Sequence, residues 1–106
     1  HLSIDPLGGI WTGRSFDLPP GSASGHNGDA QQGPFMIEMI GDFDQGQDPF
    51  EGEQKRIVQA VVVAVLRKFG LDERAVRFHA EFSDKTCPGS GIDLATFRGE
   101  IKALLA

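Results

Sequence analysis

Three short segments of the first 40 residues are rich in apolar residues and are separated by turn and loop residues, which is typical of strands. The segments 1–4 and 10–14 flank the turn sequence Asp5-Pro6-Leu7-Gly8-Gly9, and together they predict a hairpin. The segment 35–40 predicts a third strand, with its odd-numbered residues on one face and Glu38 on the other. Residues 18–34, rich in Pro, Gly, Ser, Asn and Gln, predict a long loop between them.

A helical repeat of apolar residues follows, between residues 48 and 70. Asp48 is expected as the N-cap, with Pro49 in the first helical position and Glu51 in the capping-box position. Gly70 is expected to end the helix. The stripe expected to pack on a sheet is wide and comprises Ile57, Val58, Val61, Val62, Val65, Leu66 and Phe69.

The last third of the chain predicts one more strand and one more helix. Residues 75–78 read as a short buried strand, and Asp93 is expected to cap a C-terminal helix. The inner face of that helix is expected to hold Leu94, Phe97, Ile101, Leu104 and Leu105. Strands alternating with helices indicate an α/β fold, here a mixed sheet with helices packed on it, in a single domain over residues 1–106.

The overall charge narrows the classes of partner. The chain has 106 residues and a formal net charge of −5, so nothing in its electrostatics favours binding to nucleic acid or to an anionic membrane surface. Its longest apolar run, residues 60–66, is too short for membrane insertion. The single cysteine excludes an internal disulfide and leaves the redox compartment open.

The stretch "VRFHAEFSDKTCPGSG" (76–91) carries the candidate chemistry. His79 is expected at the end of a strand, where open α/β sheets place ligand clefts, and Cys87 in the loop that follows. Imidazole nitrogen and thiolate sulfur are ligands that zinc prefers, and Lys85 adds a cation beside them. A lone cysteine is more often a small buried apolar residue, and an isolated histidine more often structural, so both interpretations stay open at this point.

The spacing of His79, Lys85 and Cys87 before Pro-Gly resembles the closing motif of the zinc-dependent N-acetylmuramoyl-L-alanine amidases, the type 2 amidase and peptidoglycan recognition protein family. Upstream, "HLSIDPLGGIWTGR" is similar to the hairpin of that family, "SASGHN" to its substrate loop and "FMIEMIGDF" to its Ile-Gly-Ile-Glu-Leu strand. An early glutamine in the long helix, Gln54, and the C-terminal helix also occur in the family's order. The resemblance covers most of the chain.

The resemblance implies an enzyme that hydrolyses the amide bond between N-acetylmuramic acid and L-alanine in peptidoglycan or muropeptides. It implies Zn²⁺ as the cofactor, with His79 and Cys87 as metal ligands. It further implies that Glu38 is the general base and that Lys85 stabilises the oxyanion. The implied substrate-binding residues are His26, Asn27 and Trp11. Polymeric peptidoglycan would place the protein outside the cell or in the cell envelope, and soluble muropeptides would place it in the cytoplasm.

Several positions depart from the family pattern. The family's first zinc ligand lies on a central strand that precedes the hairpin, so the resemblance implies that this chain is the C-terminal portion of the domain. The sheet would then have an exposed edge, and self-association through that edge is expected. Ser22 stands where a substrate-contacting histidine is common. The alternative function is a non-catalytic peptidoglycan-binding module of the same fold, or a regulatory domain that borrows it. A copper site at His1 and His79 is a further, less favoured interpretation.

Overall fold

The N-terminal hairpin expected from the sequence is present. The structure, a computed structural model, describes residues 1–13, 35–81 and 84–106. Strands β1 (Leu2–Ile4) and β2 (Ile10–Thr12) pair antiparallel, with Ser3 opposite Trp11. The turn between them closes because one carboxylate oxygen of Asp5 accepts hydrogen bonds from the backbone N–H groups of residues 7 and 9, at 2.9 and 2.8 Å. Such a side-chain turn is the usual role of aspartate at this position.

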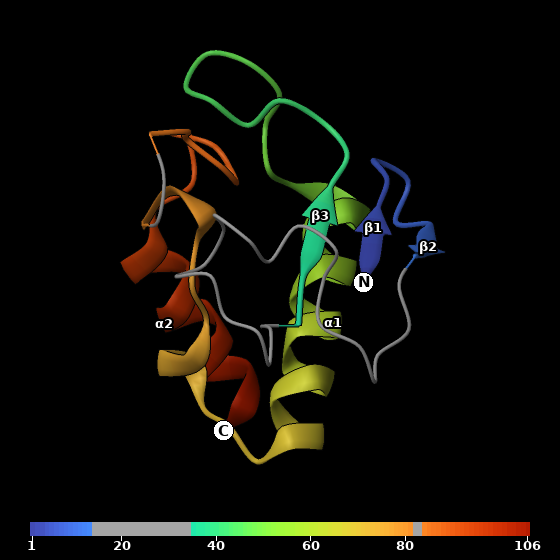
Figure 1. The fold of residues 1–106 in the computed structure, drawn as a ribbon, viewed down its shortest axis with the longest axis vertical. Helices are drawn as coiled ribbons and strands as arrows, with labels where there is room; N and C mark the ends of the chain where they lie inside the picture. Colours follow the sequence, from blue (N-terminus) through green and yellow to red (C-terminus); the bar gives the residue numbers. More distant parts are fainter. Residues whose placement is uncertain (14–34, 82–83) are drawn as a thin grey trace.

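Strand β3 (Ile37–Met39) pairs parallel with β1, which gives a three-stranded mixed sheet in the order β2-β1-β3 (Figure 1). The register sets Leu2 opposite Ile37, Ser3 opposite Glu38 and Ile4 opposite Met39. Leu2 and Ile4 are buried, so one face of the sheet is apolar. Because side chains alternate along a strand, Ser3 and Glu38 lie on the other face. The expected alternation around Glu38 is confirmed.

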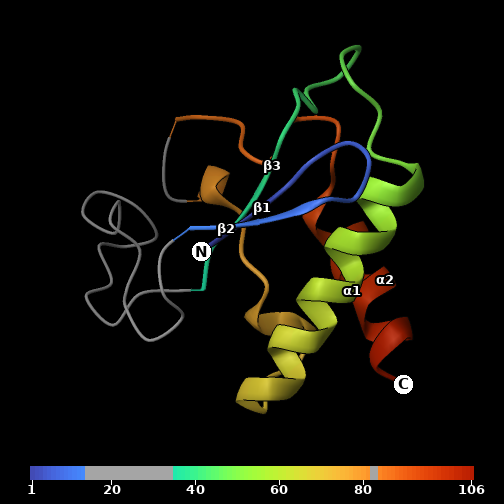
Figure 2. The ribbon, with the colours of Figure 1, turned by 90° about the vertical axis from the view of Figure 1, so that its right-hand side faces the viewer.

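Helix α1 (Gly52–Phe69) covers the apolar face, and α2 (Leu94–Leu105) lies beside it; Figure 2 shows both helices on the same side of the strands. The buried core consists of Ile4, Val58, Val63, Leu66, Phe97 and Ile101. Burying each such side chain stabilises the fold by about 1.5–3 kcal/mol before the entropy of ordering is subtracted. The chain therefore adopts a small mixed α/β fold, as the sequence predicted at that level of detail.

A buried polar side chain joins α1 to the sheet. Gln54 is only 4% exposed, and its Nε2 donates hydrogen bonds to the carbonyl oxygens of Ile4 (3.1 Å) and Ile40 (2.9 Å). The Ile4 carbonyl lies at the end of β1 and the Ile40 carbonyl lies directly after β3, so one amide group fixes the helix against both strands. A buried amide is stable in a core only when it is paired in this way.

The predicted start of α1 is wrong. The helix begins at Gly52 after Glu51, whose side chain makes no capping hydrogen bond. Asp48 instead closes the preceding loop, because its Oδ2 accepts from the backbone N–H of Asp42 at 2.9 Å. The predicted end is confirmed: Gly70 takes a left-handed conformation with φ 67°, which favours glycine.

The apolar stripe of α1 is confirmed in part. Val58 and Leu66 are buried as expected, but Phe69 is 50% exposed and Val63, outside the expected stripe, is buried. In α2 the expected cap is confirmed, since a carboxylate oxygen of Asp93 accepts from the backbone N–H of Thr96 at 2.9 Å. On its inner face Phe97 and Ile101 are buried, whereas Leu104 is 49% exposed.

The predicted strand at 75–78 is wrong. Two single-turn 3₁₀ helices, η1 (Glu73–Ala75) and η2 (His79–Glu81), occupy this region, and residues 76–78 join no ladder within the described residues. Side chains satisfy their backbone groups instead. Arg98 of α2 donates from Nε to the carbonyl oxygen of Val76 at 2.9 Å, and Glu81 accepts from the N–H of Phe78 at 2.7 Å. In Figure 1 this segment runs on the side of β3 away from β1.

No helix in the described part of the chain is both long and apolar enough to cross a membrane.

Candidate functional site

The structure places the two expected metal ligands on neighbouring stretches of backbone. His79 is half-buried at the start of η2, not at the end of a strand as expected, because residues 76–78 form no strand. Cys87 is exposed in the loop between η2 and α2. The backbone N–H of Ala80 donates a hydrogen bond to the carbonyl oxygen of Cys87 at 2.9 Å. One bond therefore brings the residue next to His79 against Cys87.

The glycines after Cys87 let its loop approach the loop that follows β3. Gly89 is buried with φ 149°, and a Cβ there would overlap the carbonyl group of Phe43. A Cβ on Gly91 would lie 2.6 Å from the carbonyl oxygen of Phe43, where the Gly91 N–H now donates a hydrogen bond at 2.9 Å. The Pro-Gly-Ser-Gly sequence thus has a steric role in addition to its place in the motif.

Asp44 makes the polar contacts between the same two loops. Its Oδ1 accepts from the hydroxyl of Thr86 at 2.7 Å and from the backbone N–H of Ser90 at 2.8 Å. These bonds, the Ser90 N–H first, lower the pKa of the Asp44 carboxyl below its ordinary value. Its role depends on a contact across more than forty residues, for which the local sequence holds no signal.

The expected general base and the expected aromatic contact share the polar face of the sheet. Glu38 is exposed on β3, and the register sets it opposite Ser3, which is itself opposite Trp11. Trp11 is 62% exposed, and its Nε1 donates to the second carboxylate oxygen of Asp5 at 2.9 Å. That bond is the largest cause that lowers the pKa of Asp5. The indole is therefore exposed to solvent and held in orientation.

The remaining predicted residues, Lys85, His26 and Asn27, are not on the strands of the sheet that the structure describes. Lys85 is exposed on the loop that carries Cys87, two residues before it. The expectation that Lys85 and Glu38 open onto one cleft stays a prediction. His26 and Asn27 lie outside the described residues.

The chemical types of the two expected ligands are suited to zinc. His79 offers an imidazole and Cys87 a thiolate, the ligand types found in zinc sites. In the parts of the chain that the structure describes, no group of three or more His, Cys, Asp or Glu side chains is arranged to hold a metal ion. Within these residues the expected pair is therefore not extended by a third protein ligand.

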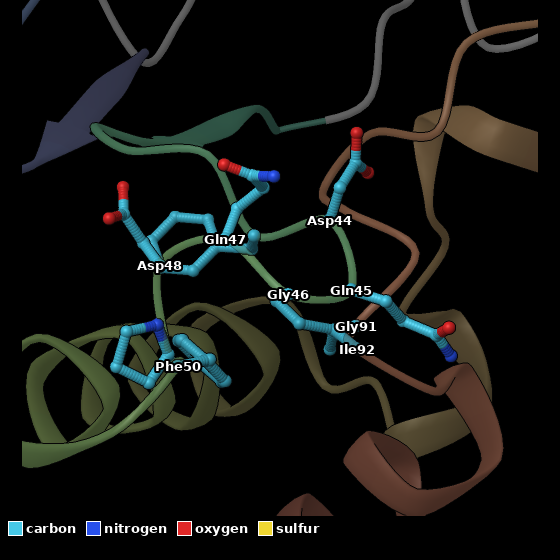
Figure 3. Close-up of a pocket in the computed structure, with 10 residues that line it drawn as sticks. Asp44, Gln45, Gly46, Gln47, Asp48, Phe50, Gly91 and Ile92 are labelled. Atoms are coloured by element: carbon cyan, nitrogen blue, oxygen red, sulfur yellow. The ribbon is translucent and has the colours of Figure 1, made fainter.

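A shallow cavity of about 370 Å³ is lined mainly by the loop that follows β3 (Figure 3). Figure 3 shows the side chains of Asp44 and Gln47 extending to one side, away from Ile92. None of the expected catalytic or metal-binding residues lines this cavity. Its lining residues are Phe43, Asp44, Gln45, Gly46, Gln47, Asp48, Pro49, Phe50, Gly91 and Ile92.

No protein-family model, no curated protein and no solved structure matches the chain.

Proposed function

We propose that the chain is the C-terminal portion of a zinc-dependent N-acetylmuramoyl-L-alanine amidase domain, in which His79 and Cys87 are metal ligands. The observation that carries the proposal is the hydrogen bond from the Ala80 N–H to the Cys87 carbonyl oxygen, 2.9 Å long. It joins two segments that the motif alone could only place eight residues apart. Ligands to one ion must come from segments that lie close together, since zinc–nitrogen and zinc–sulfur bonds are about 2.0 to 2.3 Å long.

His79 and Cys87 would hold the ion as neutral imidazole and thiolate. A bound zinc ion would supply Lewis-acid polarisation of the scissile carbonyl and would lower the pKa of a water molecule towards about 7. A third protein ligand is required for a catalytic zinc site, and the resemblance assigns it to a strand before the hairpin. The substrate class is peptidoglycan or the muropeptides derived from it.

Glu38 is proposed as the general base and Lys85 as the group that stabilises the oxyanion. Glu38 lies on the polar face of the sheet, where its carboxylate is exposed and can accept a proton from the attacking water. The ammonium group of Lys85 can donate hydrogen bonds to the oxygen of a tetrahedral intermediate. The bond cleaved joins the lactyl group of N-acetylmuramic acid to L-alanine.

A second candidate function is binding of peptidoglycan without hydrolysis, and Trp11 favours it. An exposed indole that is fixed by Asp5 presents a flat apolar face beside polar side chains, which is an arrangement suited to stacking on a sugar ring. The same residue would contribute substrate contacts in the amidase. His26 and Asn27 are proposed as further substrate contacts.

Cobalt in place of zinc tests the metal ligands. At saturating Co²⁺ we expect the purified chain to show thiolate-to-cobalt charge-transfer absorption, which Cys87→Ser abolishes and His79→Gln shifts to higher cobalt concentration. Lys85→Met is the matched control, because it alters the same loop without removing a ligand, and it should keep the absorption. A wild-type chain without this absorption would contradict the proposed metal site.

A fluorescence titration combined with a cleavage assay separates the two functions. Trp11 is the only tryptophan, so its emission reports on the polar face of the sheet directly. Titration with N-acetylmuramoyl-L-alanyl-D-isoglutamine should change the emission in either case. Cleavage of that ligand by a zinc-loaded, longer form of the protein would select the amidase, and binding without cleavage would select the module.

A further inference from the structure

The loop that carries Cys87 is attached to the rest of the fold through Asp44. A single carboxylate oxygen of Asp44 accepts two hydrogen bonds from that loop, from the Thr86 hydroxyl at 2.7 Å and from the Ser90 N–H at 2.8 Å. Thr86 immediately precedes Cys87, and Ser90 lies three residues after it. The two donors therefore bracket the cysteine, and one acceptor fixes both ends of the turn.

Two further bonds join the same loops, but they act on the far end of the turn. The backbone N–H of Gln45 donates to the Ser90 hydroxyl at 3.0 Å, and the Gly91 N–H donates to the Phe43 carbonyl oxygen at 2.9 Å. Of these contacts, the one between Asp44 and Thr86 reaches the residue adjacent to Cys87. Loss of Asp44 would leave the far end of the turn attached to Phe43 and Gln45, but it would release the end next to Cys87 from the loop that follows β3.

We propose that Asp44 is a positioning residue for Cys87: its carboxylate fixes the 86–90 turn so that the Cys87 carbonyl stays at the N–H of Ala80, beside His79. The proposal rests on the proposed function only where it concerns metal binding, since the positioning itself is a property of the two loops. Hydrogen bonds to an ionised acceptor are stronger than those between neutral groups, and two of them converge here.

The physical basis is the distance in sequence between the two loops. Residues 44 and 86 are separated by β3's connection to α1, by α1 itself and by both 3₁₀ helices, so nothing local holds them together. Turn residues without such contacts sample many conformations, and the entropy of ordering them would weaken any site they form. Asp44 removes this cost in advance, by ordering the turn before a ligand binds.

Amide hydrogen exchange at Ala80 tests the positioning directly. The Ala80 N–H is protected by its bond to Cys87, so release of the turn should expose it. Asp44→Ala should speed its exchange at least about tenfold, the factor expected when a hydrogen bond to a charged group is lost. Asp44→Asn keeps a neutral oxygen acceptor and should restore part of the protection. Asp72→Ala is the matched control, since Asp72 also accepts a backbone N–H, that of Arg74, but only within η1.

Thr86→Val keeps the test decisive if Asp44→Ala fails to fold. It removes only the hydroxyl donor and preserves the shape of the side chain, and it should speed Ala80 exchange in the same direction. Unchanged exchange at Ala80 in a folded Asp44→Ala or Thr86→Val variant would overturn the proposal.

Cobalt spectroscopy adds a measurement of metal affinity, which should stay unchanged if Asp44 has only a structural role. Asp44→Ala should shift the thiolate-to-cobalt absorption to about tenfold higher cobalt concentration, and Asp44→Asn should shift it less. A shift no larger than that of Asp72→Ala would overturn the metal part of the proposal. If the wild-type chain shows no such absorption, the proposed zinc site fails, and the Ala80 exchange data still decide whether Asp44 positions the turn.

Discussion

Ala80 and Cys87 are joined by a backbone hydrogen bond of 2.9 Å, although they lie seven positions apart in the sequence. The bond lies where η2 meets the following loop, and it places an imidazole-bearing residue and a thiol-bearing residue on adjacent backbone. A zinc motif read from sequence requires this arrangement, because ligand type alone does not bring side chains together.

We expect the 106-residue chain by itself to bind Zn²⁺ weakly and to show little or no amidase activity. Two protein ligands leave the ion mostly hydrated, so the geometry that lowers the pKa of water is lost. Isothermal titration with zinc, followed by an assay for released stem peptide, measures both properties. Tight one-to-one binding with rapid cleavage would show that the site is complete without an upstream strand.

Replacing Gln54 by alanine should lower the free energy of unfolding by about 1–3 kcal/mol, because the Ile40 carbonyl oxygen loses the Gln54 donor and the Ile4 carbonyl oxygen loses one donor while it keeps the N–H of Ile40. Urea unfolding followed by circular dichroism measures the change. Gln59→Ala on the same helix is the matched control, since the buried Nε2 of Gln59 meets no hydrogen-bond partner in the described part of the chain. An equal effect of both substitutions would mean that the two hydrogen bonds contribute nothing specific.

Glu38→Gln should reduce turnover about a hundredfold or more in an active, zinc-loaded longer form of the protein. The amide preserves the shape of the side chain and removes its ability to accept a proton at neutral pH. Glu73→Gln, at the start of η1, serves as the control for loss of one negative charge. Unchanged turnover in Glu38→Gln would exclude the general-base role, whereas cobalt binding should be unaffected by it.

Trp11 fluorescence should change as the pH falls below 3.8, the ordinary pKa of aspartate. The indole N–H lowers the folded-state pKa of Asp5, so the stability that this bond contributes is complete above the unfolded-state pKa. It is lost as the pH falls through the lower folded-state value. Emission recorded during acid titration measures the midpoint, and Asp5→Asn should abolish the transition. A midpoint above 3.8 would contradict the assignment.

Self-association through β3 is expected to rise with protein concentration. Among the described residues β3 pairs only with β1, and no described strand pairs with its outer edge. Alternation of backbone groups along a strand directs the N–H groups of Ile37 and Met39 away from β1, and that of Glu38 towards it. Hydrogen exchange at Ile37 and Met39 should therefore slow at high concentration, with Glu38 unchanged as the internal control. A monomer at all concentrations in sedimentation velocity would contradict this prediction.

Local chemistry predicted those elements whose determinants are close together in sequence. The hairpin depends on Asp5 and its turn, the C-cap on Gly70, and the N-cap of α2 on Asp93, each of which acts within five residues. The alternation that sets Glu38 away from the apolar face is equally local. These parts were therefore predictable.

The misassigned elements depend on hydrogen-bond partners that the local sequence pattern does not indicate. Asp48 has the sequence of an N-cap, but its carboxylate accepts a hydrogen bond from the backbone N–H of Asp42 in the preceding loop. The helix begins at Gly52 instead. Residues 76–78 have the composition of a strand, but the Val76 carbonyl oxygen accepts a hydrogen bond from Arg98 of α2. The local sequence does not indicate this partner. For the candidate site, His79 and Cys87 were proposed as ligands from the sequence and stay a prediction, while the contacts of Asp44 required the fold.

The contact of Phe43 with Gly89 and Gly91 has a consequence for how this protein can be altered. At Gly89 and Gly91 the cysteine loop meets the backbone of Phe43, and neither glycine has a side chain that could move aside to absorb a change. A larger residue at either glycine would force the loop of Phe43 to move, so a change in one loop requires a compensating change in the other. Libraries that randomise only the cysteine loop should return mostly unfolded clones, and productive diversity should appear when residues 42–48 vary together with residues 86–91.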